Sequence, residues 1–371
     1  MKGKHEFFGI CPIGFEAVAA AELEELSAHD IRPDHGGVHF AGSLELMFRV
    51  NLRARCLTRV LLRLASFKAL SFPELYNKSR KSFWSRYIGP VSGIAVHASC
   101  HGSRLMHSGR VEQTIAAAIS DLGLADAGGA PGYVARKATQ SIYARFENDL
   151  CTLSLDSSGE RLDRRGYRQL PGAAPLRETM AAGLLRWMAW HPDEILMVPM
   201  CGSGTIAIEA ALIGMRQAPN RERAFPFEGW PCLQQKHWQA AKEKAAGMAR
   251  PLQASIYASD LDAGILELAR ANAASAGADG IVFTQADIRS LEPVGENGLI
   301  ILNPPYGGRI GGADANRLYG QIGRRLQSHF GGWRKLVITP DADCERQLGG
   351  RVRRRLPFLH GGLHVQALDL E

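Results

Sequence analysis

Residues 298–306 read Gly-Leu-Ile-Ile-Leu-Asn-Pro-Pro-Tyr, and this stretch decides how the second half of the chain folds. Its apolar run predicts a buried strand that stops at the prolines, because a proline nitrogen cannot donate a ladder hydrogen bond. The strand brings the Asn303 carboxamide and the Tyr306 ring to the edge of a sheet, and Pro304 and Pro305 hold them in one arrangement. Two hydrogen-bond acceptors and a ring suit a flat, planar amine. A strand followed by an ordinary turn is the alternative interpretation.

Strand and helix signals alternate on both sides of this stretch, which is typical of a parallel sheet covered by helices. The predicted strands lie at residues 195–198, 255–259, 281–284, 298–302 and 335–339, and the predicted helices at residues 205–212, 263–276 and 318–330. We therefore predict an α/β, Rossmann-like domain that runs from about residue 160 to the end of the sequence.

Three predicted strand ends carry residues that suit a nucleoside. Gly202-Ser203-Gly204 lies between a strand and a helix, so the backbone can approach a ligand at a helix N-terminus. Asp260 ends the second strand, where dinucleotide-type folds hold a ribose diol, and Asp287 after the third strand suits an adenine edge. The alternative role of each aspartate is a helix N-cap. A nicotinamide dehydrogenase is the competing function, but its first turn needs a third glycine and this loop continues with Thr205.

The sequence pattern of the first half of the chain predicts a smaller α+β region. Its predicted helices lie at residues 12–28, 44–55, 72–87 and 111–122, and its predicted strands at residues 36–40, 59–64, 93–98, 141–146 and 150–155. The last two strands form a hairpin that turns at Asn148-Asp149. In the second half, residues 220–230 are rich in proline, glycine and charge, and we interpret them as a rim or lid beside the site, or else as a solvated surface excursion.

The composition is that of a globular protein. The 371 residues carry a net charge of +7, with 46% hydrophobic and 22% charged residues, and the length predicts two or three domains. Since no apolar stretch reaches membrane-spanning length and residues 1–10 lack the core of a signal peptide, we expect a cytoplasmic protein. The seven cysteines never form a C-x-x-C pair, so we expect free thiols and no metal site. The positive charge favours a polyanionic partner.

Taken together, these motifs resemble the class I S-adenosylmethionine-dependent amino-methyltransferases. The chain is more closely similar to the THUMP-domain RNA guanine-N2-methyltransferases, typified by the bacterial 23S rRNA enzymes. Further similarity to that family lies in residues 36–42, 51–55, 155–162, 164–168 and 174–179. The resemblance implies a ferredoxin-like segment at residues 1–62, a THUMP RNA-binding domain at residues 63–156 and a methyltransferase domain at residues 157–371.

The resemblance also implies which residues act. The catalytic set is Asn303, Pro304, Pro305 and Tyr306. The implied cofactor is S-adenosylmethionine, and its binding residues are Pro199, Met200, Cys201, Gly202, Ser203, Gly204, Thr205, Asp260, Leu261, Asp287, Ile288 and Asn303. The chain departs from the family at Val198, where the family has an aspartate near the methionine end of the cofactor. The valine removes an anionic acceptor for the cofactor's ammonium group, a loss on the order of 1.5–3 kcal/mol.

The implied reaction is methylation of the N2 amine of a guanine in RNA, with 23S rRNA as the expected substrate. The Asn303 side-chain oxygen and the Pro304 carbonyl accept the two amine hydrogens, while a flipped or unpaired guanine stacks on Tyr306. No strong general base is required, which agrees with the lack of an obvious His or Glu beside the motif. The alternatives are a tRNA guanine, a DNA adenine or a protein glutamine as the substrate, and a non-catalytic RNA-binding factor whose cofactor affinity Val198 impairs. Neither a membrane nor an obligate protein partner is indicated.

Two basic clusters are candidates for phosphate contacts, with solvated charge as the alternative role. They are residues 351–355 and the group Lys78, Arg80, Lys81 and Arg86. Residues 360–363, His-Gly-Gly-Leu, predict a hairpin turn that closes the sheet.

Overall fold

The computed structural model describes residues 3–89, 92–126, 139–168, 176–307 and 310–371. The chain forms two compact units, neither of which is continuous in sequence. Unit 1 contains residues 1–10, 23–162 and 220–244, and unit 2 contains residues 11–22, 163–219 and 245–371. The predicted boundaries at residues 62 and 156 divide the chain into continuous domains. In the structure, residues 11–22 belong to unit 2 and residues 220–244 belong to unit 1.

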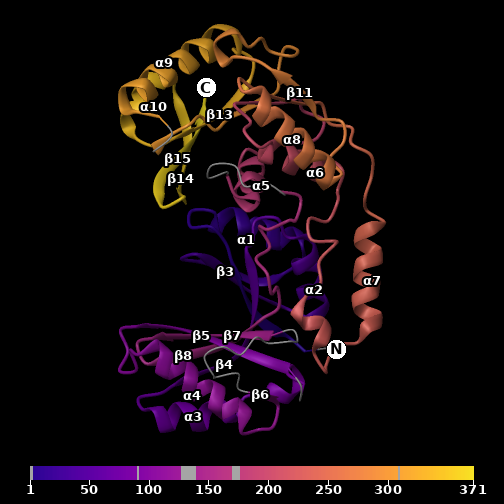
Figure 1. Ribbon diagram of the computed structural model, residues 1–371, viewed down its shortest axis with the longest axis vertical. Helices are drawn as coiled ribbons and strands as arrows, with labels where there is room; N and C mark the ends of the chain where they lie inside the picture. The colour runs from indigo at the N-terminus through magenta and orange to yellow at the C-terminus, as the bar shows by residue number, and fades with distance from the viewer. Residues whose placement is uncertain (1–2, 90–91, 127–138, 169–175, 308–309) are drawn as a thin grey trace. The chain divides into compact units, whose positions relative to one another are not determined.

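Unit 1 is built on a mixed sheet with the strand order β2-β3-β1-β4-β8-β7-β5-β6 (Figure 1). Its strands are β1 (His5–Ile10), β2 (His29–Asp34), β3 (Gly37–Gly42), β4 (Arg59–Lys68), β5 (Ser92–His101), β6 (Ala125–Asp126), β7 (Thr139–Glu147) and β8 (Leu150–Asp156). Its helical segments are α2 (Leu44–Arg53), α3 (Phe72–Arg80), η1 (Trp84–Arg86), α4 (Ser108–Ser120), η2 (Pro226–Gly229) and most of α7 (Gln235–Ala246), while α1 (Glu16–Glu25) has residues in both units. The predicted hairpin joins β7 to β8, and Asn148 and Asp149 have positive φ values of 50° and 65°, as a two-residue turn requires.

The helix predicted over residues 72–87 ends earlier than expected. Helix α3 stops at Arg80, and the short η1 follows after a gap. Trp84 is buried, and its indole N–H donates to the Ser79 carbonyl at 2.7 Å. This side chain therefore satisfies a carbonyl that the end of an α-helix leaves unpaired, and the backbone turns away.

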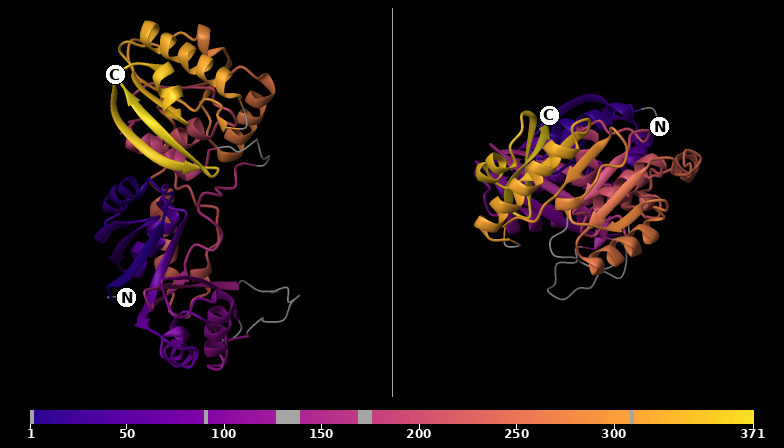
Figure 2. Two further views of the ribbon diagram at one scale, coloured as in Figure 1. Left: turned by 90° about the vertical axis from the view of Figure 1, so that its left-hand side faces the viewer. Right: turned by 90° about the horizontal axis from the view of Figure 1, so that it is seen from above.

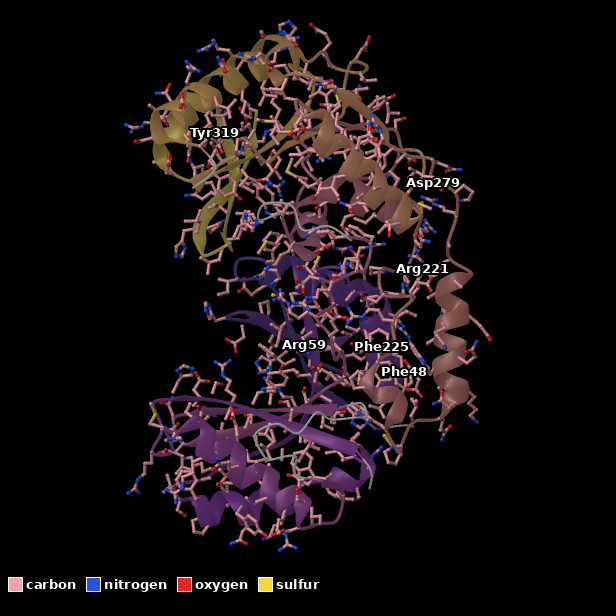
Figure 3. The ribbon with its side chains drawn as sticks, viewed as in Figure 1. Phe48, Arg59, Arg221, Phe225, Asp279 and Tyr319 are labelled. Atoms are coloured by element: carbon pink, nitrogen blue, oxygen red, sulfur yellow. The ribbon has the colours of Figure 1, made fainter. Side chains whose placement is uncertain are left out.

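Residues 220–230 belong to unit 1, where their aromatic side chains are buried, so they are not a solvated excursion, and a role as a rim or lid beside the site stays a prediction. Phe225, Phe227 and Trp238 are buried. The Phe227 ring stacks on Phe48 of α2 with 5.0 Å between ring centroids, and it stacks on Phe225 at 5.1 Å. Figure 3 labels Phe48 and Phe225, which lie near each other in this cluster. Aromatic pairs of this kind bury large areas and hold the segment against α2.

Unit 2 contains a sheet with the strand order β11-β10-β9-β12-β13-β15-β14. Its strands are β9 (Leu196–Pro199), β10 (Ile256–Asp260), β11 (Val282–Gln285), β12 (Leu299–Leu302), β13 (Arg334–Thr339), β14 (Val352–His360) and β15 (Leu363–Leu370). Its helical segments are α5 (Glu178–Trp187), α6 (Thr205–Gly214), α8 (Ala263–Ala276), η3 (Ile288–Ser290), α9 (Gly312–His329) and α10 (Ala342–Leu348). The first five strands along the order pair in parallel, which confirms the predicted Rossmann-like α/β fold.

The core of unit 2 explains why the strands read as continuous apolar runs. On one face of the sheet, Met197, Ile300 and Leu302 pack with Tyr319 and Leu326 of α9. Figure 3 labels Tyr319. Helix α5 contacts α6, α6 contacts α8, and α9 contacts α10 (Figure 1). Parallel strands covered on both faces are apolar on both faces. None of the helices in the described ranges has the length and apolarity needed to cross a membrane.

The topology places a switch point in this sheet. After β9 the chain adds β10 and β11 on one side, and it then crosses over to add β12 on the other side of β9. Ligands in open α/β sheets bind at the carboxyl ends of the strands at such a point. The loops that follow β9, β10, β11 and β12 are therefore the place to look for a site.

Candidate active site

The loop between β9 and α6 forms one wall of the candidate site. Met200, Gly202 and Gly204 have positive φ values of 55°, 54° and 83°, a left-handed conformation that favours glycine. A Cβ atom added to Gly202 would meet no atom within 4 Å, so open space lies beside this backbone. Gly204 begins α6 without a side-chain cap, which leaves amide hydrogens of the first turn for a ligand. The loop fits the predicted contact with S-adenosylmethionine.

The other predicted residues of this loop hold its shape. Pro199 ends β9. The Ser203 and Thr205 hydroxyls lie 3.4 Å apart, and Arg168 donates to the Thr205 hydroxyl at 2.9 Å. Burial raises the pKa of the Cys201 thiol to about 12, so this thiol stays protonated at neutral pH and is no nucleophile.

Asp260 lies beside this loop at the carboxyl end of β10. Its Oδ2 accepts from the Gly202 N–H at 2.9 Å, and its Oδ1 accepts from the Asp262 N–H at 3.2 Å. The N-cap of α8 is Asp262, so the alternative role of Asp260 as a helix cap is wrong. A carboxylate oxygen can accept more than one hydrogen bond, so Asp260 keeps capacity for the two hydroxyls of a ribose. Leu261 next to it is 62% exposed and offers apolar surface.

Asp287 is engaged in a different way. It caps η3 by accepting from the Arg289 N–H at 2.9 Å, and its other oxygen accepts from Arg289 Nε at 2.8 Å. The hydrogen bonds from the Arg289 side chain and backbone lower the pKa of Asp287, so the carboxylate is ionised at neutral pH. For Asp287 the N-cap interpretation is therefore correct, and contact with an adenine edge stays a prediction. Ile288, which follows, is buried in the core.

Asn303 follows β12 directly, and its side chain carries a hydrogen-bond acceptor that a ligand can use. Its side-chain oxygen is buried and has no hydrogen-bond partner among the described residues. Leaving a buried acceptor unsatisfied costs about 1–3 kcal/mol, and such an exception needs a specific explanation. Because β12 pairs with β9, Asn303 and the loop after β9 lie at the same edge of the sheet. A ligand with an N–H donor would satisfy this oxygen.

Tyr306 is more buried than the predicted stacking of a guanine on its ring requires. Pro304 is buried and Pro305 half-buried, and Tyr306 is only 4% exposed. The Tyr306 hydroxyl lies 2.5 Å from His360 Nδ1. Stacking of a guanine on the Tyr306 ring stays a prediction, and it requires a face of this ring to become accessible.

A buried network of charges lies behind the first turn of α6. Besides Thr205, Arg168 contacts Glu178 of α5 at 3.3 Å. Arg165 and Glu209, both almost fully buried, lie 3.4 Å apart. Burial raises the pKa of Glu178 to about 7, against the opposing effect of Arg168. The end of the loop between β9 and α6 is thus held by charges that are largely shielded from water. The predicted family motif at residues 174–179 begins with Ala174 and Pro175, which lie outside the described residues.

Unit 1 carries a hollow of about 650 Å³ with a marked excess of positive charge. Arg63 lies in it at a point where the register between β4 and β8 shifts, and such bulges redirect side chains. Burial and the neighbouring Arg145 lower the pKa of Arg63 to about 10, so this arginine is still charged at neutral pH. Phe83, at 77% exposure, also lines the hollow. The other charged or titratable lining residues are Lys4, His5, Glu6, Arg32, His39, Arg86 and Tyr87.

The two predicted phosphate-binding clusters differ in how their charges are paired within the chain. In the run at residues 351–355, Arg351 and Arg353 each lie 3.4 Å from the Glu371 carboxylate, Arg354 pairs with Asp369 and Arg355 pairs with Glu345. Three of the chain's own side-chain carboxylates thus offset most of the charge of these four arginines. In the other cluster, Lys78 pairs with Glu74 and Arg80 lies over the Tyr76 ring, whereas Arg86 lines the cationic hollow.

Sequence reasoning missed two residues beside the predicted site. Arg168 contacts Thr205, and His360 contacts Tyr306 although it lies 54 positions further along the chain. The statement that no histidine lies beside the Asn-Pro-Pro-Tyr motif is therefore wrong. Nothing local in the sequence marks His360, because the contact depends on how β14 and β15 join the sheet. Val198, where the resemblance implies an aspartate in the family, is 1% exposed within β9.

Two family models match this chain. The RMKL-like methyltransferase domain matches residues 165–366, and the RlmL ferredoxin-like domain matches residues 6–61. A Synechocystis protein whose name assigns it to the RNA methyltransferases is 35% identical over 98% of this chain and 96% of its own length. The ribosomal RNA large subunit methyltransferase K/L of Methylococcus capsulatus is 34% identical over 97% of this chain, which spans only 50% of that protein. A crystal structure assigned as a methyltransferase and complexed with SAH has a TM-score of 0.89 at 29% identity, with 100% of this chain and 98% of that chain covered.

Proposed function

This chain belongs to the RMKL-like methyltransferase family, and on that basis we propose that it methylates the exocyclic N2 amine of a guanine in large-subunit ribosomal RNA. It is an S-adenosylmethionine-dependent RNA methyltransferase. Bound S-adenosylmethionine supplies an electrophilic methyl group on a sulfonium sulfur. The protein's part is to hold the amine in line with that methyl group.

The unsatisfied oxygen of Asn303 carries this proposal. The exocyclic amine of guanine is a weak nucleophile, because its lone pair is delocalised into the ring. If the Asn303 oxygen and the Pro304 carbonyl accept its two hydrogens, the amine is oriented and becomes richer in electrons. Transfer would exchange the bond from the methyl carbon to sulfur for a bond to the amine nitrogen and leave a neutral thioether. The extra proton of the methylated amine can then pass to water, so no strong base is needed before that step.

Residues on the neighbouring strand ends suit the cofactor. We propose that Asp260 binds the ribose hydroxyls and that the methionine part of the cofactor lies close to the backbone at Gly202. We further propose that Asp287 and Ile288 contact the adenine edge. The support is the open space beside Gly202 and the free acceptor capacity of Asp260.

We propose that unit 1 binds the RNA. It includes the predicted THUMP domain at residues 63–156 and the predicted ferredoxin-like segment except for residues 11–22. The support is the cationic hollow around Arg63, because neutralised phosphates supply much of the affinity of proteins for nucleic acids. Phe83 at its edge offers an exposed ring on which a base can stack.

The deciding experiment uses labelled S-adenosylmethionine with total RNA, DNA and protein from a strain that lacks the gene. We expect label in RNA at the N2 of a guanine, and a loss of about 10²–10³-fold in kcat for Asn303→Ala, the size seen when one positioned hydrogen bond to the reacting group is removed. Asn297→Ala, an exposed residue near the other end of β12, is the control and should behave as wild type. Label in DNA or protein alone would identify a different substrate class. No binding of S-adenosylmethionine by calorimetry, without rescue by Val198→Asp, would support a non-catalytic RNA-binding protein instead.

A further inference from the structure

The tip of the β14–β15 hairpin packs against the loop that carries the catalytic motif. The left view of Figure 2 shows these two strands as a long, curved pair at the C-terminal end of the chain. His360 pairs with Leu363 across a two-residue turn at Gly361 and Gly362, whose φ values are 59° and 84°. A Cβ atom added to Gly307, the residue after the motif, would lie 2.8 Å from Leu363 Cδ1. The hairpin tip and the loop are thus in close contact.

His360 occupies an unusual place for a polar residue. Along β14 the alternate residues Leu356, Phe358 and His360 are all buried, so the histidine sits at the last position of an apolar face. A hairpin turn alone does not require a buried imidazole there. Buried polar side chains are kept where they have a partner, and the Tyr306 hydroxyl is one partner of this imidazole.

The contact between the two side chains is tight. The Tyr306 hydroxyl lies 2.5 Å from His360 Nδ1, and the two rings meet edge to face, with centroids 5.9 Å apart and an interplanar angle of 74°. Both residues are at most 5% exposed. A neutral imidazole that carries its proton on Nε2 accepts the phenolic proton at Nδ1. With little water to compete, such a hydrogen bond is strong and directional.

The Asn303 oxygen depends on this anchor because no described residue holds it directly. Its position follows from the backbone, and Pro304 and Pro305 make that backbone stiff as far as Tyr306. We propose that His360 is a positioning residue for methyl transfer, which fixes Tyr306 and through it the acceptors at Asn303 and Pro304. This inference rests on the function proposed above and adds a residue to it.

The test is a double-mutant cycle on the full chain. His360→Leu removes the acceptor, Tyr306→Phe removes the hydroxyl and keeps the ring, and a third protein carries both changes. We expect each single change to lower kcat about 10- to 100-fold, as small misplacements of reacting groups do. The KM for RNA and the Kd for S-adenosylmethionine should change less than about twofold. The double variant should lose no more than either single variant, because both changes break the same bond.

Two further variants separate positioning from general damage. His360→Asn places an amide oxygen near the position of Nδ1 and should restore most of kcat, and it also keeps the test valid if the leucine variant does not fold. His364→Ala, an exposed histidine on β15, should leave kcat unchanged. Wild-type kcat in His360→Leu, or losses that multiply in the double variant, would overturn the proposal.

A readout that does not depend on activity separates this inference from the proposed function. In nitrogen-15 NMR of the histidine rings, Tyr306→Phe should shift the Nδ1 signal of His360 and leave that of His364 unchanged. An unchanged His360 signal would mean that the hydrogen bond does not form. A shifted signal in a protein that transfers no methyl group to RNA would confirm the bond and refute the proposed reaction.

Discussion

At Val198 the resemblance implies an aspartate in the family, and the burial of this position gives a carboxylate there two opposite effects. At 1% exposure, a carboxylate in its place would be desolvated without a partner until the cofactor's ammonium group arrives. We predict that Val198→Asp lowers the melting temperature of the cofactor-free protein and tightens binding of S-adenosylmethionine about tenfold or more. Thermal melts and calorimetric titration measure the two effects.

A matched control separates charge burial from cofactor contact. Val337 in β13 is equally buried, so Val337→Asp should lower the melting temperature without tightening cofactor binding. Equal cofactor affinity in Val198→Asp and wild type would show that position 198 does not face the ammonium group.

Glu178 makes stability depend on pH in an unusual direction. Its pKa is about 7 in the folded protein against 4.5 as the ordinary value, because burial disfavours the charged form. Between these pH values the folded state binds more protons than the unfolded state, so this group lowers the free energy of unfolding as pH rises, by about 3 kcal/mol in all. We predict that Glu178→Gln reduces the fall in melting temperature between pH 4.5 and pH 8. Glu222→Gln, on an 84% exposed side chain, should leave the pH profile unchanged. Equal profiles for wild type and Glu178→Gln would contradict the prediction.

At the scale of elements, the contact between α9 and α10 depends on one glycine. A Cβ atom added to Gly323 would lie 1.9 Å from the Leu348 carbonyl oxygen, which is backbone and cannot rotate away. We predict that Gly323→Ala destabilises the protein by about 1–3 kcal/mol, because the two helices must move apart. A thermal melt measures this. Gly331→Ala, where an added Cβ meets no atom within 4 Å, should change the melting temperature far less, and an equal loss in both variants would refute the packing argument.

The elements of the parallel sheet were predictable because their signals are local. Helix α8 begins and ends as predicted, since Asp262 caps its start and Gly277 adopts a φ of 65° just past its end. The strand before Asn303 is apolar on both faces and ends at two prolines. The placement of residues 220–244 and of His360 was not predictable, because both depend on contacts between segments far apart in the sequence. The same holds for Arg63, whose place in a cationic hollow follows from a register shift and not from its neighbours.

At the scale of the whole molecule, the net charge of +7 indicates a nucleic-acid-binding surface only where the positive side chains lie together. Intramolecular pairs take up the arginines at residues 351–355, whereas the hollow in unit 1 has Arg32 and Arg86 among its cations. We predict that Arg32→Ala with Arg86→Ala weakens RNA binding for all sequences alike. The slope of log affinity against log salt should fall by about 0.7–0.9 for each phosphate that the variant no longer neutralises.

Fluorescence anisotropy over a salt series measures that slope. Arg346→Ala, a 75% exposed residue of unit 2 that pairs with Asp343, removes the same kind of charge elsewhere and should leave the slope unchanged. An equal fall in slope per charge removed in both proteins would mean that net charge alone, and not the hollow, attracts the RNA.

The exchange of segments between the units sets the order in which a ribosome can finish them. Unit 1 cannot complete its core until residues 220–244 have been synthesised, because Phe225, Phe227 and Trp238 come from that segment. Unit 2 in turn uses residues 11–22, which leave the ribosome long before any of their partners beyond residue 162. Domains usually fold in the order of synthesis, first the N-terminal one. In this protein unit 1 is complete only once residue 244 has been synthesised, after part of unit 2, and a truncated chain that stops between residues 162 and 220 leaves Phe48 without its stacked partner.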